Sequence, residues 1–255
     1  MKFFTDKTVI NDYLLIKIGD YRKVKDFSRW KEVFIDPGVY ELTNDVEYSW
    51  VTKGMYSYMD EWIKNLPDNH YFSWDYPCDM NIFHTDYFLR KSWSNAKRYC
   101  IYPHYIVTVQ SKFHDYMSFV EWFDKYNALD IKSGIMGLGN ICRILQKTQY
   151  IKHALPYAFK NCRHPRIHIY GLAFKNIEFT MKLADHYGIE LSIDSTKWTR
   201  ACTVELKKKY NINCNGKNRQ EFFDEYLKQI SLLRSHRTNK SPIASFKYPI
   251  LSKVI

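Results

Sequence analysis

Residues 166–193 read RIHIYGLAFKNIEFTMKLADHYGIELSI, and this stretch decides the fold class. A short apolar run, Arg166–Tyr170, precedes Lys175–Tyr187, where apolar residues recur at helical spacing: Ile177, Met181, Ala184 and Tyr187. A second apolar run, Glu190–Ile193, follows this predicted helix. Near-continuous apolar strands separated by helices are typical of a parallel sheet covered on both faces. The stretch therefore predicts a strand, a helix and a parallel strand.

The same alternation recurs toward the N-terminus. Further predicted strands are Tyr13–Ile18, Glu32–Ile35, Tyr71–Trp74, Tyr105–Val109 and Ser133–Leu138. A helix is predicted over His114–Tyr126, with Met117, Val120, Trp122 and Phe123 forming its stripe. The alternatives are a doubly wound sheet and a (β/α)₈ barrel, and we favour the TIM-like barrel because GxGxxG and P-loop motifs are absent. An eighth strand is expected at Thr203–Leu206 or at Phe246–Leu251.

No repeat, low-complexity tract or linker divides the sequence, so we expect one barrel domain over residues 1–255. Residues 203–255 form a basic and helical C-terminal segment of that domain. Its predicted helix, Arg219–Arg234, presents an apolar face of Phe222, Phe223, Tyr226, Ile230 and Leu233.

Composition excludes a disordered or acidic chain. Hydrophobic residues make up 45% of the 255 positions, and Lys+Arg exceed Asp+Glu by 38 − 27 = +11. The positive charge suits a polyanionic partner, with general solubility as the alternative. No apolar stretch reaches the length of a membrane span, and the beginning of the chain lacks a signal-peptide core, so we expect a cytoplasmic protein without membrane contact.

The six cysteines include no CxxC pair, so we expect reduced thiols and no zinc or other cofactor. The two cysteines nearest the C-terminus, Cys202 and Cys214, lie twelve positions apart. With His236 they would still lack a fourth zinc ligand from that region.

Chemistry in parallel α/β folds gathers at the carboxyl ends of the strands. The residues there are Asp36, Asp75, Gln110, Gly137, Gly139, Gly171 and Asp194. The carboxylates suit a divalent metal or catalysis at a sugar carbon. We favour the second because His104 and His168 are expected at or before the beginnings of their strands. In the alternative interpretation each Asp is a helix N-cap, Gly137 and Gly139 are turn residues, and Gln110 is a surface loop residue.

Six segments, in order, resemble the motifs of the tRNA-guanine transglycosylase superfamily. Residues 34–40 resemble its TDSGGFQ segment, 72–78 its FDECTPYP segment, 107–111 its IVQGS turn, 134–139 its IGGLAVGE segment, 167–172 its HLMGVG segment and 191–200 its DMFDCVLPTR segment. The resemblance covers roughly residues 32–200. It implies that Asp194 is the nucleophile and Asp36 the acid/base. It also implies that Asp75, Gln110 and backbone amides near Gly137, Gly139 and Gly171 hold the base.

The chain departs from the tRNA enzymes by lacking their CxCxxC…His zinc site. The segment IDSTKWTR is more similar to the DNA 7-deazaguanine transglycosylases of phages and bacteria. This resemblance implies exchange of guanine in DNA for a 7-deazaguanine, through a covalent aspartyl-glycosyl intermediate. Alternatives are a DNA glycosylase that excises guanine, a tRNA-guanine transglycosylase, and a non-catalytic nucleic-acid-binding subunit.

Phosphate contacts are expected from Lys197, Arg200, Lys207, Lys208 and Lys209, whose alternative role is a solvated surface. Aromatic residues near the motifs could stack on an extruded base or belong to the core: Trp74, Tyr76, Tyr170 and Trp198.

Overall fold

The computed structural model describes residues 1–37, 53–76, 78, 85–113, 115–141, 148–194 and 219–235. Its strands are β1 (Lys2–Phe4), β2 (Tyr13–Lys17), β3 (Glu32–Asp36), β4 (His70–Phe72), β5 (Val107–Val109), β6 (Ile135–Leu138), β7 (Arg166–Ile169) and β8 (Glu190–Asp194). Its helices are α1 (Ile18–Tyr21), α3 (Lys53–Lys64), α4 (Thr85–Tyr99), α5 (Tyr116–Asn127), α6 (Thr148–Asn161), α7 (Phe174–Tyr187) and α10 (Arg219–Ser235). Strands and helices alternate through most of this region, so the predicted α/β class is confirmed.

The described strands pair in parallel and form two sheets. The larger has the order β1-β8-β7-β6-β5, and the smaller has the order β2-β3-β4. Backbone hydrogen bonds continue from each edge of the larger sheet into the smaller one. Leu15 N–H donates to the Thr5 carbonyl at 2.7 Å, and Ile106 N–H donates to the Phe72 carbonyl at 2.9 Å. The two sheets therefore share their hydrogen-bonding network at both edges.

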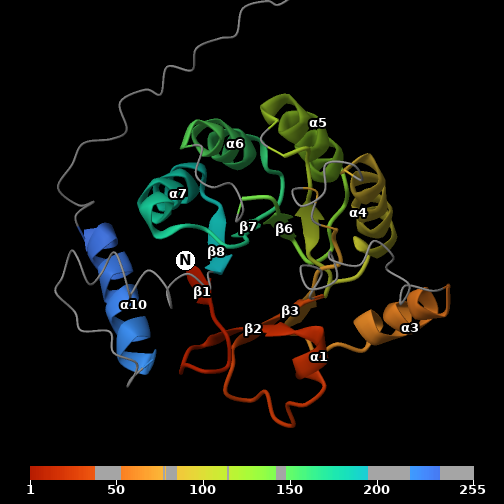
Figure 1. Cartoon of the computed structure of the whole chain (residues 1–255), viewed down its shortest axis with the longest axis horizontal. Coiled ribbons are helices and arrows are strands. Elements are labelled where there is room, and N and C mark those ends of the chain that lie inside the picture. Colours follow the sequence, from red (N-terminus) through yellow and green to blue (C-terminus); the bar gives the residue numbers. More distant parts are fainter. Residues whose placement is uncertain are drawn as a thin grey trace, which may run out of the picture.

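Helices α4 to α7 lie one after another around the outside of the strands (Figure 1). Helix α7 buries Ile177, Met181 and Ala184, as its spacing predicts, and ends at Gly188 in the left-handed conformation (φ 67°). In α5 the expected stripe is partly wrong. Phe123 is buried, but Met117 is 67% exposed, because the face that packs inward runs through Phe119.

The strand that the sequence did not reveal is β1, at the N-terminus. It pairs with β8 in the register Lys2↔Ser192, Phe3↔Ile193 and Phe4↔Asp194. Three residues are too few for a strand period to be recognised, which is why this element escaped prediction. The two segments expected to hold an eighth strand, 203–206 and 246–251, lie outside the described residues.

The strands separate two apolar clusters. Successive side chains point to opposite faces, so Val33 and Ile35 join the main core beneath the helices, whereas Phe34 points the other way. There it meets Phe4, with the ring centroids 3.9 Å apart. Ile106 and Ile135 complete this smaller cluster between the strands. Because side chains alternate along a strand, a residue two positions after a member of this smaller cluster points to the same side of its strand as that member.

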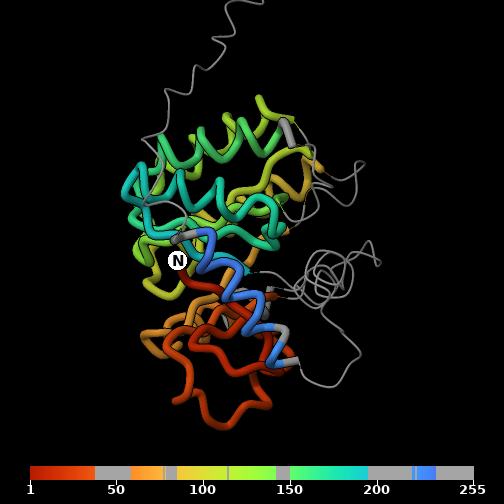
Figure 2. Tube along the Cα trace, turned by 90° about the vertical axis from the view of Figure 1, so that its left-hand side faces the viewer, coloured from red at the N-terminus to blue at the C-terminus, as the bar shows by residue number. Residues whose placement is uncertain are grey.

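Helix α10 confirms the predicted C-terminal helix. It lies beside β1 and α7, and in Figure 2 it runs along the side of the strands. Phe223 and Tyr226 are buried against Phe3, and Tyr226 also contacts the ring of Phe174. The helix thus covers the sheet where β1 joins it. None of the helices in the described residues has the length and apolar character that a membrane crossing needs.

Candidate active site

Asp194 is the last residue of β8, and its side chain is buried at the carboxyl end of the larger sheet. The Gly171 N–H donates to Asp194 Oδ1 at 2.9 Å, and His168 Nε2 lies 3.4 Å from the same oxygen. Gly171 follows β7 and has a φ of 62°, a conformation that glycine adopts without strain. Both contacts use Oδ1, which leaves Oδ2 without a partner among the described residues.

Gly171 therefore contacts the expected nucleophile, although the sequence assigned it to base binding. A backbone N–H that donates to a carboxylate stabilises its ionised form.

Asp75 follows β4 and is held by two neighbours. The Ser73 hydroxyl donates to Oδ1 at 2.7 Å, and Gln110 Nε2 donates to Oδ2 at 2.5 Å. Burial nevertheless raises the pKa of Asp75, because desolvation outweighs the two hydrogen bonds, which act in the opposite direction. Gln110 Oε1 is buried and has no hydrogen-bond partner among the described residues. This corner of the site therefore presents a carboxylate next to an unpaired amide oxygen.

Two glycines of β6 and the loop after it make room for this arrangement. A Cβ on Gly139 would lie 2.2 Å from Gln110 Nε2, and a Cβ on Gly137 would lie 2.9 Å from the Tyr170 ring. The resemblance implied that backbone amides near these glycines hold the base. In the described residues, side chains of the site itself occupy that space, and the Gly139 N–H already donates to the Val109 carbonyl at 3.0 Å.

Tyr170 is close enough to Asp75 and Asp194 for both charges to act on it. Its hydroxyl accepts a hydrogen bond from Thr108 Oγ1 at 3.4 Å. Desolvation raises the pKa of Tyr170 well above its usual value, and the negative charges of Asp75 and Asp194 add to this effect. The tyrosine therefore stays protonated and supplies a neutral polar group near them.

Asp36 ends β3 opposite Lys17 of β2. Asp36 comes two residues after Phe34, so both side chains point to the same side of β3. On that side the ring of Phe34 contacts His168, with the ring centroids 4.7 Å apart. Asp36, Asp75 and Asp194 thus lie at or just after the carboxyl ends of β3, β4 and β8.

Trp74 and Tyr76 belong to the main core. Trp74 stacks on Tyr99, and Tyr76 stacks on Phe88. Both are buried, so the core interpretation applies to them, and Tyr170 remains the aromatic residue at the site. The remaining expected contacts lie outside the described residues: Lys197, Trp198, Arg200, Cys202, Lys207, Lys208, Lys209, Cys214 and His236.

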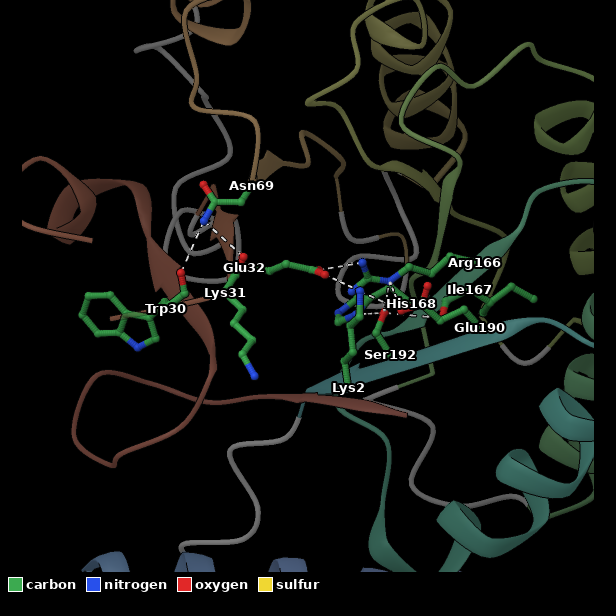
Figure 3. Close-up of polar contacts among 10 residues, drawn as sticks. All are labelled: Lys2, Trp30, Lys31, Glu32, Asn69, Arg166, Ile167, His168, Glu190 and Ser192. Atoms are coloured by element: carbon green, nitrogen blue, oxygen red, sulfur yellow. Dashed lines mark hydrogen bonds and ion pairs between the residues drawn. The ribbon is translucent and has the colours of Figure 1, made fainter. Parts of the chain in front are cut away.

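A second set of polar residues, which the sequence did not single out, fills the interior at the opposite ends of the strands. Glu32 of β3 accepts hydrogen bonds from both Lys2 of β1 and Arg166 of β7, as Figure 3 shows. Arg166 Nε also donates to Ser192 Oγ at 3.0 Å.

His168 continues this set toward Asp194. It lies within β7 instead of at or before the beginning of its strand, which corrects the expectation. A signal for this polar set was present in the sequence. Polar residues recur at every second position, at Arg166, His168 and Tyr170 and again at Ser192 and Asp194, which is the spacing of side chains on one face of a strand.

The fold and the site define the class of the chain: an α/β protein with parallel strands that carries carboxylates at the carboxyl ends of those strands. In comparisons with known proteins, neither a protein-family model, nor a curated protein, nor a solved structure matches the chain.

Proposed function

We propose that the protein is a transglycosylase that exchanges guanine in DNA for a 7-deazaguanine base. The observation that carries the proposal is the state of Asp194. Its Oδ1 receives the Gly171 N–H, and its Oδ2 has no partner among the described residues. A buried, oriented carboxylate of this kind suits attack on an anomeric carbon.

The proposal includes a closed (β/α)₈ barrel. Its support is the continuation of hydrogen bonds from β1 toward β2 and from β4 toward β5, because together with the two sheets these links join each strand to two neighbours. The small aromatic cluster of Phe4 and Phe34 would then fill the barrel interior, and the site would lie at its carboxyl end.

In the proposed reaction, Asp194 Oδ2 attacks C1′ of a guanosine in the polymer. The C1′–N9 bond breaks and Asp36 gives a proton to the departing guanine. The incoming 7-deazaguanine loses its N9 proton to Asp36 and attacks C1′, which releases Asp194. One N-glycosidic bond replaces another, so no energy cofactor is consumed.

Asp75 and Gln110 support recognition of guanine. The Watson–Crick edge of guanine carries the N1–H and N2–H donors, and the site offers a carboxylate beside the unpaired Gln110 Oε1. Because Gly139 N–H is bonded to Val109, we assign no base contact to that amide. The burial cost of Asp75 would be offset when these donors are bound.

DNA is the preferred polymer because the chain resembles the DNA-directed branch and carries a net charge of +11. In a duplex, guanine must leave the stack to reach Asp194, which costs a few kcal/mol.

The test is incubation of the protein with radiolabelled guanine and, separately, duplex DNA or tRNA. We expect label to enter DNA and a denaturant-stable protein–DNA adduct to accumulate when no incoming base is supplied. Asp194→Asn should abolish both while leaving DNA binding within about twofold, since phosphate contacts do not depend on the nucleophile. Abasic sites without incorporation would indicate a glycosylase, label in tRNA alone would indicate the tRNA enzyme, and unchanged exchange by Asp194→Asn would refute the mechanism.

A further inference from the structure

A chain of hydrogen-bonding groups runs through the interior from the amino ends of the strands to Asp194. Arg166 Nη1 donates to Glu32 at 2.6 Å, and Arg166 Nε donates to Ser192 Oγ at 3.0 Å (Figure 3). Ser192 Oγ lies 3.0 Å from His168 Nδ1, and His168 Nε2 lies 3.4 Å from Asp194 Oδ1. Arg166, His168 and Ser192 are all buried.

The direction of donation along this chain follows from Arg166. A guanidinium has only donors and does not lose its proton in proteins, so Ser192 Oγ must act as the acceptor toward it. The hydroxyl proton of Ser192 then has two acceptors in reach, His168 Nδ1 at 3.0 Å and the Ile167 carbonyl at 3.5 Å. The shorter contact makes Nδ1 an acceptor, and a neutral imidazole must then carry its proton on Nε2.

The opposite tautomer would be unfavourable at both ends of the imidazole. An Nδ1–H would leave the Ser192 hydroxyl proton only the long 3.5 Å contact to the Ile167 carbonyl, and a bare Nε2 lone pair would face the negative Asp194 Oδ1. Nε2 forms no hydrogen bond that meets the geometric criteria among the described residues, and Asp194 Oδ1, at 3.4 Å, is the carboxylate oxygen within ion-pair distance of it.

We propose that His168 is a positioning residue that stays neutral, is protonated on Nε2, and holds Asp194 Oδ1 so that Oδ2 is the oxygen that attacks the sugar. Its tautomer is set by Arg166 through Ser192. The role in catalysis rests on the proposed function, whereas the tautomer does not.

The surroundings of His168 support a neutral ring. The rings of Phe4 and Phe34 contact it from β1 and β3, and Tyr170 contacts it from the turn that follows β7. Desolvation lowers the pKa of His168, although Asp194 acts in the opposite direction.

The charged and titratable groups that act on the ring are Asp194 on β8, Arg166 on β7 and Glu32 on β3. Arg166 lowers the imidazole pKa, and Glu32 raises it. Tyr170 stays protonated beside the ring.

The first experiment tests the tautomer without any substrate. Long-range ¹H–¹⁵N spectra of full-length protein labelled at histidine should contain one neutral, Nε2-protonated imidazole that does not titrate between about pH 5 and 8 and that is missing in His168→Gln. Ser192→Ala removes the donor to Nδ1, and we expect a larger Nδ1-protonated fraction than in the wild type, with the Nε2-protonated form still favoured by Asp194. A His168 signal that is Nδ1-protonated in the wild type, or that titrates as an exposed histidine, would overturn the proposal.

The second experiment tests the role in the reaction by following formation of the covalent adduct against pH. His168→Leu keeps an apolar side chain among the aromatic rings but donates no hydrogen bond, and we expect adduct formation to slow by about 10–100-fold. The acid limb of its pH profile should move to higher pH, because the ionised carboxylate has lost a donor. His168→Gln can donate a hydrogen bond from its side-chain amide, so the acid limb of its pH profile should return to the wild-type position.

Slow adduct formation in the leucine variant with an unmoved acid limb, or a glutamine variant that behaves like leucine, would reduce His168 to a packing residue and overturn its role. If the wild type forms no adduct with DNA or tRNA, the proposed function fails, and the spectra still decide the tautomer.

Discussion

At the scale of single residues, the two carboxylates Asp194 and Asp75 are held by different kinds of hydrogen-bond donor. Asp194 receives a backbone N–H at its Oδ1. Asp75 receives two side-chain donors, yet burial still raises its pKa above the usual 3.8. A group with a raised native pKa binds its proton more tightly in the folded chain than in the unfolded chain. Stability is therefore lost as the pH rises from the unfolded toward the folded pKa, so the unfavourable effect of Asp75 is larger at neutral pH than in acid.

We expect Asp75→Asn to raise thermal stability at pH 7 by a few degrees, since about 1 kcal/mol corresponds to roughly 2–4 °C at this size. The asparagine amide would remove the buried charge and could donate to Gln110 Oε1, which lacks a partner among the described residues. Melting curves from about pH 4 to 8 measure this effect, and the gain should shrink as the pH falls. A variant that melts below the wild type at neutral pH would contradict the assignment of strain to Asp75.

The same substitution should weaken guanine binding by about 10–100-fold, because a charged acceptor for N1–H and N2–H is removed. Calorimetric titration with free guanine measures it, and Ser111→Ala, next to Gln110 in the sequence but outside the proposed base edge, serves as a control.

Gly139→Ala offers a test of how Gln110 is held. The added methyl would lie 2.2 Å from Gln110 Nε2 and 2.9 Å from the Val109 carbonyl, so the side chain must move away from Asp75. We expect a loss of about 1–3 kcal/mol in unfolding free energy together with weaker guanine binding. Gly19→Ala is the matched control, because no atom lies within 4 Å of its added methyl and its effect should stay within about 0.5 kcal/mol. Equal effects of the two substitutions would argue against close packing at Gly139.

At the scale of elements, β7 shows how one strand serves two environments. Ile167 and Ile169 enter the main core, whereas Arg166 and His168 belong to the polar interior. Helix α10 has a simpler role, because its buried residues cover β1, and its Gln220 exchanges hydrogen bonds with the Ile10 backbone after that strand. The short strand at the sheet edge is thus held by a helix from the far end of the sequence.

Phe223→Ala should therefore destabilise the protein by about 3–5 kcal/mol, the usual cost of removing a fully buried phenylalanine. Denaturant titration followed by tryptophan fluorescence measures the change. Leu232 lies on the same helix and is 42% exposed, so Leu232→Ala should cost less than about 0.5 kcal/mol. Similar losses for both variants would mean that α10 does not pack on β1 through Phe223.

At the scale of the whole molecule, the ionic cluster and the carboxylate site occupy opposite ends of the strands. Lys2, Glu32 and Arg166 lie at the amino ends, where the carboxylate of Glu32 pairs with both cations. The carboxyl ends carry Asp36, Asp75 and Asp194, so a polyanion that binds there, as proposed, would need compensating cations. The sequence supplies such cations after β8, at Lys197, Arg200 and residues 207–209.

Replacing Lys207, Lys208 and Lys209 together by Gln should weaken DNA binding and lower the slope of log affinity against log salt by roughly 0.9 for each phosphate that is no longer neutralised. The rate of base exchange at saturating DNA should change little. Fluorescence anisotropy at several salt concentrations gives the slope. A slope equal to that of the wild type would make this run a solvated surface.

The sequence by itself determined the alternation of strands and helices, because apolar spacing reports the local period of each element. It also predicted that Asp75 and Gln110 lie at strand ends, and the structure joins these two side chains by a hydrogen bond. It did not reveal β1, since three residues carry no measurable period.

Only the tertiary structure decided which inward residues meet. Glu32 and Arg166 are 134 positions apart in sequence, and their contact depends on strand register and on how the two sheets pack. The contact between His168 and Asp194 likewise depends on the pairing of β7 with β8, which fixes His168 beside Ser192. A period of two gives the face on which a side chain lies, but the neighbour across that face is set by packing of the whole chain.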